Sequence, residues 1–187
     1  LIGDLSFALH KIETEMQVHR LNNIFTKIPQ PMSFVSQDYR YLAVNDMYAE
    51  LYRTASENIV GHTPSEFFDK ELFETEIKPR IDRCLAGETV HYEIDVNFPG
   101  KGPRCMYMSY YPYYDVKGII SGIITHGIDI NESKETETRL TESENRFRSI
   151  FEKSPIGIEL YDDKGFLTHA NQACLDIFGI LDVNEVM

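Results

Sequence analysis

Tyrosine is the residue type whose clustering in this chain most suggests binding chemistry. Five tyrosines occur between positions 107 and 114, namely Tyr107, Tyr110, Tyr111, Tyr113 and Tyr114. A tyrosine combines an aromatic ring with a phenol hydroxyl, so it can hold a small aromatic or apolar ligand in one orientation. In a strand, alternate positions face opposite sides, which places Tyr107, Tyr111 and Tyr113 together and Tyr110 and Tyr114 together. The alternative interpretation is a filled core plus a surface that packs on a neighbour.

Residue types for catalysis or metal binding are present, but without the spacing that such chemistry needs. The sequence has no Gly-rich phosphate loop, no His-Glu-x-x-His zinc motif and no nucleophile elbow. His10 and His19 lack the surroundings of a phosphoacceptor histidine. Cys84, Cys105 and Cys174 are odd in number and show no metal-ligand spacing, which favours reduced, packed thiols. We therefore expect no catalytic residue, no metal site and no enzymatic activity in this chain.

Charge and hydropathy exclude two further classes of partner. The formal net charge of −12 over 187 residues argues against nucleic acid, whose binding depends on Lys and Arg. No apolar run reaches the roughly 20 residues that cross a membrane, so we expect no membrane contact by this segment. The chain begins without Met and stops within a pattern. We expect a cytoplasmic piece of a longer protein, which could itself be anchored in a membrane.

A repeat of 126 positions defines the organisation of the chain. Phe25-x-Lys27-x-Pro29 leads to Asn45, and Phe151-x-Lys153-x-Pro155 leads to Asn171 at the same distance. This period exceeds the roughly 20–50 residues of solenoid repeats, so it indicates a domain plus a linker. The predicted parts are an N-terminal signalling and dimerisation helix (1–28), a complete domain (29–131), a connecting helix (132–151) and the first part of a second domain (152–187).

The order of elements in the complete domain predicts its fold class. Alternating apolar residues indicate strands over 32–36, 39–44, 90–98, 104–114 and 119–130. Between the second and third strands we expect a helix from Asn45 to about Arg53 and a longer helix from Lys70 to Leu85. Two strands, a run of helices and three strands are typical of an α+β fold with an antiparallel sheet. The N-terminal helix could form a dimeric coiled coil or lie against its own domain.

Four segments together resemble the PAS domain family of sensory modules. Two are the hairpin with its Asn-capped helix, at Met32–Arg53 and again at Ile158–Phe178. Gly127-Ile128-Asp129-Ile130-Asn131 resembles the family's Asp-Ile-Thr signature, with Asn131 in place of Thr. The segment from Glu144 to Ile158 is similar to the start of a PAS repeat in multidomain sensor kinases. The resemblance covers 29–131 as a whole domain and 147–187 as a truncated one.

The resemblance implies a PAS fold, in which a five-stranded antiparallel sheet carries helices on one face and is flanked by N-terminal and C-terminal helices. It implies a sensory and dimerisation module that passes the state of a ligand or partner through those helices to an effector absent from this segment. A sensor histidine kinase of a two-component phosphorelay is the favoured parent. A diguanylate cyclase, a transcription regulator and a spacer that dimerises without binding a ligand are the alternatives.

A small apolar or aromatic ligand would lie between sheet and helices. The candidate lining residues are Met32, Phe34, Tyr48, Tyr52, Phe67, Tyr107 and Tyr111. The Asn-Cys-Arg-Phe motif of flavin-binding family members is absent, and His62, the nearest haem-ligand candidate, is expected in a turn. The identity of any cofactor therefore stays open. The partner expected from the flanking helices is a second copy of the chain.

Overall fold

The computed structural model describes residues 2–179, without the side chains of residues 2–10, 12 and 14. The chain divides into two compact units, Leu1–Asn131 and Glu132–Met187, which we describe separately. The second domain is expected to extend to residue 187, and residues 180–187 lie outside the described part of the chain. None of the described helices is both long and apolar enough to cross a membrane.

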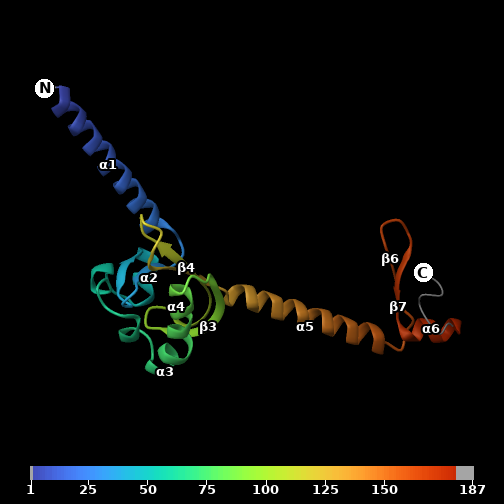
Figure 1. The fold of residues 1–187 in the computed structure, drawn as a ribbon. Helices are drawn as coiled ribbons and strands as arrows, with labels where there is room; N and C mark the ends of the chain where they lie inside the picture. The colour runs from blue at the N-terminus through green and yellow to red at the C-terminus, as the bar shows by residue number, and fades with distance from the viewer. Residues whose placement is uncertain (1, 180–187) are drawn as a thin grey trace. The chain divides into compact units, whose positions relative to one another are not determined.

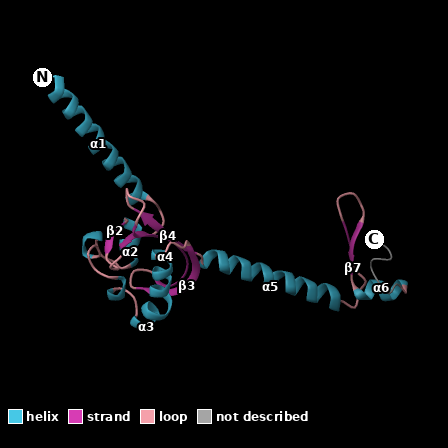
Figure 2. Ribbon diagram, in the orientation of Figure 1, coloured by secondary structure: helices cyan, strands magenta, loops and turns pink. Residues whose placement is uncertain are grey.

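The first unit contains the predicted five-stranded antiparallel sheet (Figures 1 and 2). Its strands are β1 (Met32–Ser36), β2 (Tyr41–Val44), β3 (Val90–Phe98), β4 (Gly102–Tyr114) and β5 (Ile120–Asp129), in the order β2-β1-β5-β4-β3. The N-terminal strand β1 thus pairs with the last strand β5, with Phe34 opposite Ile124. This central pairing brings the two ends of the domain together in one sheet.

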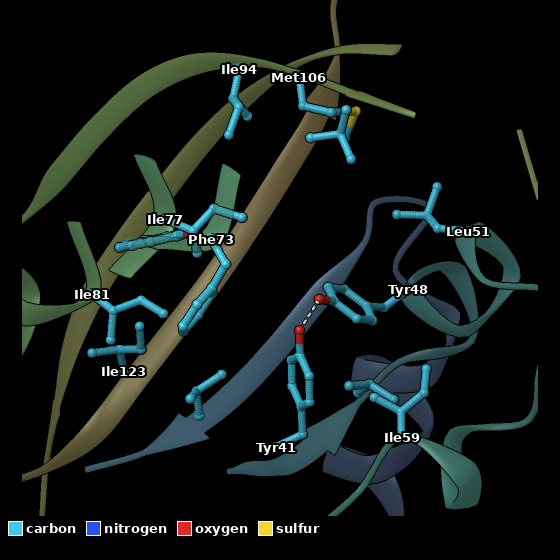
Figure 3. Packing of buried hydrophobic residues seen from close by; sticks show 14 of the residues in the cluster. Tyr41, Tyr48, Leu51, Ile59, Phe73, Ile77, Ile81, Ile94, Met106 and Ile123 are labelled. Carbon is cyan, nitrogen blue, oxygen red and sulfur yellow. Dashed lines mark hydrogen bonds between the residues drawn. The ribbon is translucent and has the colours of Figure 1, made fainter. Parts of the chain in front are cut away.

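The helices of this unit comprise one long helix and several short ones. The long one is α1 (Ile2–Lys27), and α2 (Asp46–Leu51), α3 (Lys70–Leu72) and α4 (Lys78–Leu85) follow the hairpin. Single 3-10 turns lie at Ser56–Asn58 and Pro64–Glu66. Phe73, Ile77 and Ile81 pack with Val35 and Ile123 of the sheet in one buried cluster (Figure 3). The expected arrangement, with helices on one face of the sheet, is confirmed.

The helix expected from Lys70 to Leu85 is present with these bounds, and it contains a π-helical turn that the sequence did not predict. A π-helical turn spans Phe73–Ile77 between α3 and α4, and the Lys78 amide bonds to the Phe73 carbonyl. Pro79 follows directly and has no amide hydrogen for the carbonyl one turn earlier, so a regular α-helical ladder is broken here. The wider turn keeps both Phe73 and Ile77 buried in the core.

The second unit has a connecting helix and a small hairpin with one further helix. Helix α5 (Asn131–Lys153) is followed by β6 (Glu159–Tyr161), β7 (Leu167–Ala170) and α6 (Gln172–Phe178). The two strands form an antiparallel pair of their own. Phe151, Cys174 and Leu175 are its buried apolar residues among those described. The order of elements agrees with that of the first hairpin and its capped helix.

Candidate ligand cavity

A small cavity of about 30 Å³ lies between the sheet and the helices of the first unit. Its lining residues come from all five strands and from the helical segment: Pro31, Ser33, Val35, Tyr41, Tyr48, Leu51, Pro64, Phe68, Ile77, Ile81, Tyr92, Ile94, Val96, Phe98, Met106, Met108, Tyr110 and Thr125. A buried water needs about 10–15 Å³ measured in this way, so the cavity has room for one or two waters. Its walls are apolar except for six hydroxyl groups.

These hydroxyls form three pairs around the cavity. The Tyr41 and Tyr48 hydroxyl oxygens lie 2.5 Å apart and point toward one another (Figure 3). Tyr92 and Tyr110, on neighbouring strands, form a second pair at 2.5 Å. The third pair joins Ser33 of β1 to Thr125 of β5 at 2.6 Å and is fully buried. In each pair one hydroxyl donates and the other accepts.

Burial keeps the phenols around the cavity protonated. It raises the pKa of Tyr48 and of Tyr92 to about 12 and those of Tyr41 and Tyr110 well above 10. The cause is loss of water around the charged form, since a phenolate in an apolar surrounding is poorly solvated. The site therefore presents neutral hydroxyls as hydrogen-bond donors and acceptors.

A fifth tyrosine adds an unused polar group beside the cavity. The ring of Tyr52 packs 5.6 Å from that of Tyr48 and 5.7 Å from that of Phe98. Burial, and then the neighbouring Tyr48 phenol, raise the pKa of Tyr52 well above 10. The Tyr52 hydroxyl is nonetheless outside hydrogen-bonding geometry with every described residue. A buried polar group without a partner is costly, so such a group is a candidate contact for a ligand or water.

The structure corrects four of the seven predicted lining residues. Tyr48 lines the cavity, and Tyr52 and Phe67 pack against the core beside it with ring centroids 5.2 Å apart. By contrast, Met32, Phe34, Tyr107 and Tyr111 lie on the opposite face of the sheet: Ser33 and Val35 are buried in β1, and Met106 and Tyr110 are buried in β4. Ligand binding by any of the seven residues stays a prediction.

The sequence contained a signal for the correct face of β4. Val90, Ile94 and Phe98 mark the buried face of β3, and the turn after Phe98 fixes the register of the hairpin. In the structure Val90 lies opposite Tyr110 and Ile94 opposite Met106, so the even-numbered residues of β4 face the helices. Directly opposed residues of antiparallel strands share a face. Applying that rule to the turn would have selected Tyr110 in place of Tyr107 and Tyr111.

The outer face of the sheet carries Tyr107 and Tyr111. His91 stacks on Tyr107 at 6.1 Å, meets Tyr111 edge-on at 5.8 Å and hydrogen-bonds through Nδ1 to the Ser109 hydroxyl at 2.9 Å. Tyr111 is 42% exposed, in contrast to 4% for Tyr110 one residue earlier. This face is a surface of aromatic rings, and the inner face is the cavity wall.

Asn45 connects the cavity walls to the N-terminal helix. Its Oδ1 accepts hydrogen bonds from the amides of Met32, at 2.9 Å, and Tyr48, at 3.0 Å. Its Nδ2 donates to the carbonyls of Gln30, at 2.7 Å, and Ile28, at 3.3 Å, just beyond the end of α1. The side chain is fully buried. One amide group therefore ties the exit of α1, the start of β1 and the first turn of α2 together.

A second set of contacts connects the cavity to the C-terminal helix. Asn131, the first residue of α5, accepts a hydrogen bond from the Cys105 amide at 2.6 Å. Cys105 precedes Met106, which lines the cavity. The Asp129 carboxylate forms an ion pair with Arg104 at 3.1 Å and accepts a hydrogen bond from the backbone amide of Asn131 at 3.0 Å. The start of α5 is thus fixed to the strand that forms one cavity wall.

His62 and Cys84, two side chains that could hold a cofactor, are not among the residues that line the cavity. The His62 ring lies in a turn and bonds the Glu66 carboxylate through Nδ1 at 2.8 Å. The backbone amide and hydroxyl of Thr63 and the His62 ring together lower the pKa of Glu66 to about 2. Cys84 is fully buried, and that burial raises its thiol pKa to about 11. Within residues 2–179 as described, no three His, Cys, Asp or Glu side chains converge on a metal-sized site.

Solved structures of similar fold include PAS domains from several organisms. The PAS domain of BvgS from Bordetella pertussis is 23% identical, with 71% of this chain and 98% of that chain aligned at a TM-score of 0.51. A PAS domain from Colwellia psychrerythraea is 13% identical, with 62% of this chain and 98% of that chain aligned at 0.54. At these identities the likeness shows the fold. Among curated proteins no sequence matches this chain.

A longer protein with the same fold is phage VqmA in complex with DPO. It is 18% identical and aligns at a TM-score of 0.55 over 70% of this chain; the alignment spans 60% of the VqmA chain. Family profiles match the sequence directly, one described as PAS fold over residues 25–135 and one described as PAS domain over residues 145–186. The first covers the cavity and both of its helix connections. The chain belongs to the PAS family of sensory domains.

Proposed function

We propose that this chain is a ligand-responsive sensory and dimerisation module, which converts the state of its cavity into a change in the geometry of α1 and α5. The observation that carries the proposal is the Asn45 side chain, whose four hydrogen bonds connect the cavity residue Tyr48 with the exit of α1. A ligand that shifts Tyr48 would move the backbone amide of Tyr48, which donates a hydrogen bond to Asn45 Oδ1. Because one rigid planar side-chain amide makes all four hydrogen bonds, the other three would respond to that movement.

The partner we propose is a second copy of the chain, bound through the flanking helices. Helix α1 exposes Met16, Leu21 and Ile24, each more than half accessible. Helix α5 exposes Leu140 and Phe147, which are seven residues apart and therefore lie on the same side of a helix. Apolar side chains of this size in water favour association with a partner helix. A dimer would let a change in helix geometry be read as a change between paired helices.

The effector that receives the signal belongs to one of two proposed classes. The resemblance of 144–158 to the start of a repeat in sensor kinases favours a histidine kinase. The VqmA structures, one described as a dimer in the absence of target DNA and another as a complex with ligand and DNA, favour a DNA-binding regulator equally. Such an effector would read helix geometry in the cytoplasm and lie in another part of the protein.

The second candidate function is a dimerising spacer that binds no ligand. It is favoured by the size of the cavity, since about 30 Å³ is far below the roughly 300 Å³ at which ligand pockets of small molecules begin. The two candidates differ in one respect that can be measured: a sensor binds a small molecule in the cavity, and a spacer does not.

Native mass spectrometry of the freshly purified protein tests both parts of the proposal. We expect a dimer, and we expect part of the protein to carry an additional small mass that is released on denaturation. A protein that remains monomeric at micromolar concentration would contradict the dimerisation role. A dimer without bound mass, whose cavity signals in NMR also fail to respond to any of a small-molecule library, would establish the spacer instead.

A further inference from the structure

The cavity has no charged group with which to bind an ion. Every polar side chain in its wall is a hydroxyl, from Ser33, Thr125 and four tyrosines. The Arg80 guanidinium lies 4.2 Å from the centroid of the Tyr92 ring and is already paired with Glu76 at 2.5 Å. A charge that enters an apolar interior without a partner loses its hydration and gains little in return. The wall composition therefore selects against charged ligands.

The phenols that line the cavity have hydroxyl hydrogens that no hydrogen bond uses. Tyr41 and Tyr48 carry two hydroxyl hydrogens and share one hydrogen bond. Tyr92 and Tyr110 likewise carry two and share one. One hydrogen of each pair therefore has no acceptor in hydrogen-bonding geometry among the described residues. A molecule in the cavity that accepts hydrogen bonds would satisfy groups that the protein leaves unsatisfied.

Negative charge is disfavoured by the same surroundings. The burial that raises the pKa values of Tyr41 and Tyr110 would act on a ligand carboxylate in the same direction. A neutral acceptor, such as a carbonyl oxygen or an unprotonated ring nitrogen, accepts the spare hydrogens without that cost. A hydrocarbon of the same shape would avoid the cost too, but it would leave the hydroxyls unsatisfied.

The wall can enlarge at two flexible side chains. Met106 and Met108 both line the cavity from β4. The amide of Cys105, the residue before Met106, donates a hydrogen bond to Asn131 at the start of α5. Methionine side chains are unbranched and adapt to irregular shapes at low energetic cost. A ligand of a few heavy atoms would need more space than the present 30 Å³, and displacement of these two side chains would supply it.

From these features we infer that the ligand is a small neutral compound, mainly apolar, that carries at least one hydrogen-bond acceptor for the tyrosine hydroxyls. The inference rests on the proposed sensory function and adds the chemical class of the ligand. It predicts discrimination by charge and by acceptor among molecules of equal shape.

The test uses four probes built on one five-membered ring. Cyclopentanone is neutral and has an acceptor, and methylenecyclopentane replaces its oxygen with an apolar CH₂ group. Cyclopentanecarboxylate and cyclopentylammonium carry opposite charges at pH 7. Each is titrated into the whole chain labelled with ¹³C in its methionine methyl groups. We expect cyclopentanone to shift the Met106 and Met108 signals, with methylenecyclopentane about tenfold weaker and the ions without effect at the same concentrations.

Substitutions show whether the phenols supply the selectivity. In Tyr48→Phe and Tyr110→Phe, cyclopentanone should bind about fivefold to tenfold more weakly, while the affinity for methylenecyclopentane stays within about twofold. Tyr111→Phe, on the outer face, is the matched control and should leave both affinities unchanged. The methionine spectrum of each variant reports directly whether the fold is retained.

Three results would overturn the inference. Equal affinity for cyclopentanone and methylenecyclopentane would show that no acceptor is required. Tighter binding of either ion would show that the cavity accepts charge. In both cases the sensory function would stand and only the ligand class would be wrong. No response to any probe at millimolar concentration would reject the class at this size, and if a broad library also failed, the sensory function would fall with it.

Discussion

Asn45 of the first unit and Asn171 of the second occupy equivalent positions, and three of their four hydrogen bonds are equivalent. The fourth goes to the Ile28 carbonyl in the first unit and to the Phe151 carbonyl in the second. The Asn171 Oδ1 accepts hydrogen bonds from the backbone amides of Ile158, at 2.8 Å, and Cys174, at 3.0 Å. Its Nδ2 donates to the carbonyls of Phe151, at 2.8 Å, and Ile156, at 2.9 Å. Like Asn45, it is fully buried. The two modules therefore connect the exit of a long helix, a first strand and a capped helix through one amide group.

The side chains next to this amide differ between the two modules. Tyr48, three residues after Asn45, corresponds to Cys174, and Ser33 of β1 corresponds to Glu159 of β6. In the second unit the Cys174 thiol donates to the Glu159 carboxylate at 3.2 Å, and this contact raises the pKa of Cys174. The hydrogen-bonded frame, by which one Asn side chain joins the helix exit, the first strand and the capped helix, is therefore independent of the interior chemistry. The same frame can carry a wall of neutral hydroxyls or a thiol beside a carboxylate.

The largest expected effect on stability comes from removing the four hydrogen bonds of Asn45 in the first unit. Asn45→Ala removes four hydrogen bonds from a buried side chain and leaves two amides and two carbonyls without their partner. We expect the free energy of unfolding to fall by about 3 kcal/mol, measured by urea denaturation. Asn58→Ala is the control, because Asn58 is exposed and makes one hydrogen bond, to Thr54. A loss below about 1 kcal/mol for Asn45→Ala would contradict the role of the amide as the frame.

The equivalent change in the second unit should act locally. Asn171→Ala should increase hydrogen exchange at the amides of 156–178 and leave the exchange of β1 to β5 unchanged, since the described contacts of Asn171 all lie within its own unit. Faster exchange in the first unit would show that the two frames are coupled.

The frame was predictable from the sequence, and the cavity wall was only partly so. The repeated Pro-to-Asn spacing, the hairpins and the capped helices all depend on contacts within about 20 residues, which sequence patterns report well. The inward side of β1 was not predictable in the same way, because Met32, Phe34 and Val35 put apolar residues on both faces. The π turn before Pro79 also depends on how Phe73 and Ile77 pack against the sheet, which no local pattern records.

Alkaline pH should weaken the first unit through its cavity phenols. Because the folded-state pKa of Tyr48 and Tyr92 is about 12 and the unfolded value about 10, the folded state retains protons that the unfolded state releases. Their contribution is full below pH 10 and is lost as the pH rises from about 10 to about 12, by about 3 kcal/mol for each tyrosine. Urea denaturation at pH 9 to 11 should show a smaller decline in Tyr48→Phe than in the original sequence. An identical decline in both would contradict the assigned burial.

The smallest expected effect on the free energy of unfolding comes from removing a single tyrosine hydroxyl. This effect should differ between the cavity wall and the outer face of the sheet. Tyr48→Phe removes one partner of the Tyr41 pair and should lower the free energy of unfolding by about 1 kcal/mol at pH 7. Tyr111→Phe removes a hydroxyl from an exposed ring and should change it by less than about 0.5 kcal/mol. Equal effects, measured by urea denaturation, would remove the distinction between cavity wall and outer surface.

The proposed function requires the cavity wall to be coupled to the two flanking helices. Hydrogen exchange measured by mass spectrometry in Tyr48→Phe and Tyr111→Phe reports on this coupling. We expect faster exchange in Tyr48→Phe at the exit of α1 (28–32) and at the start of α5 (129–133), with no change there in Tyr111→Phe. Exchange that changes only within the cavity wall, or changes equally in both variants, would contradict the coupling.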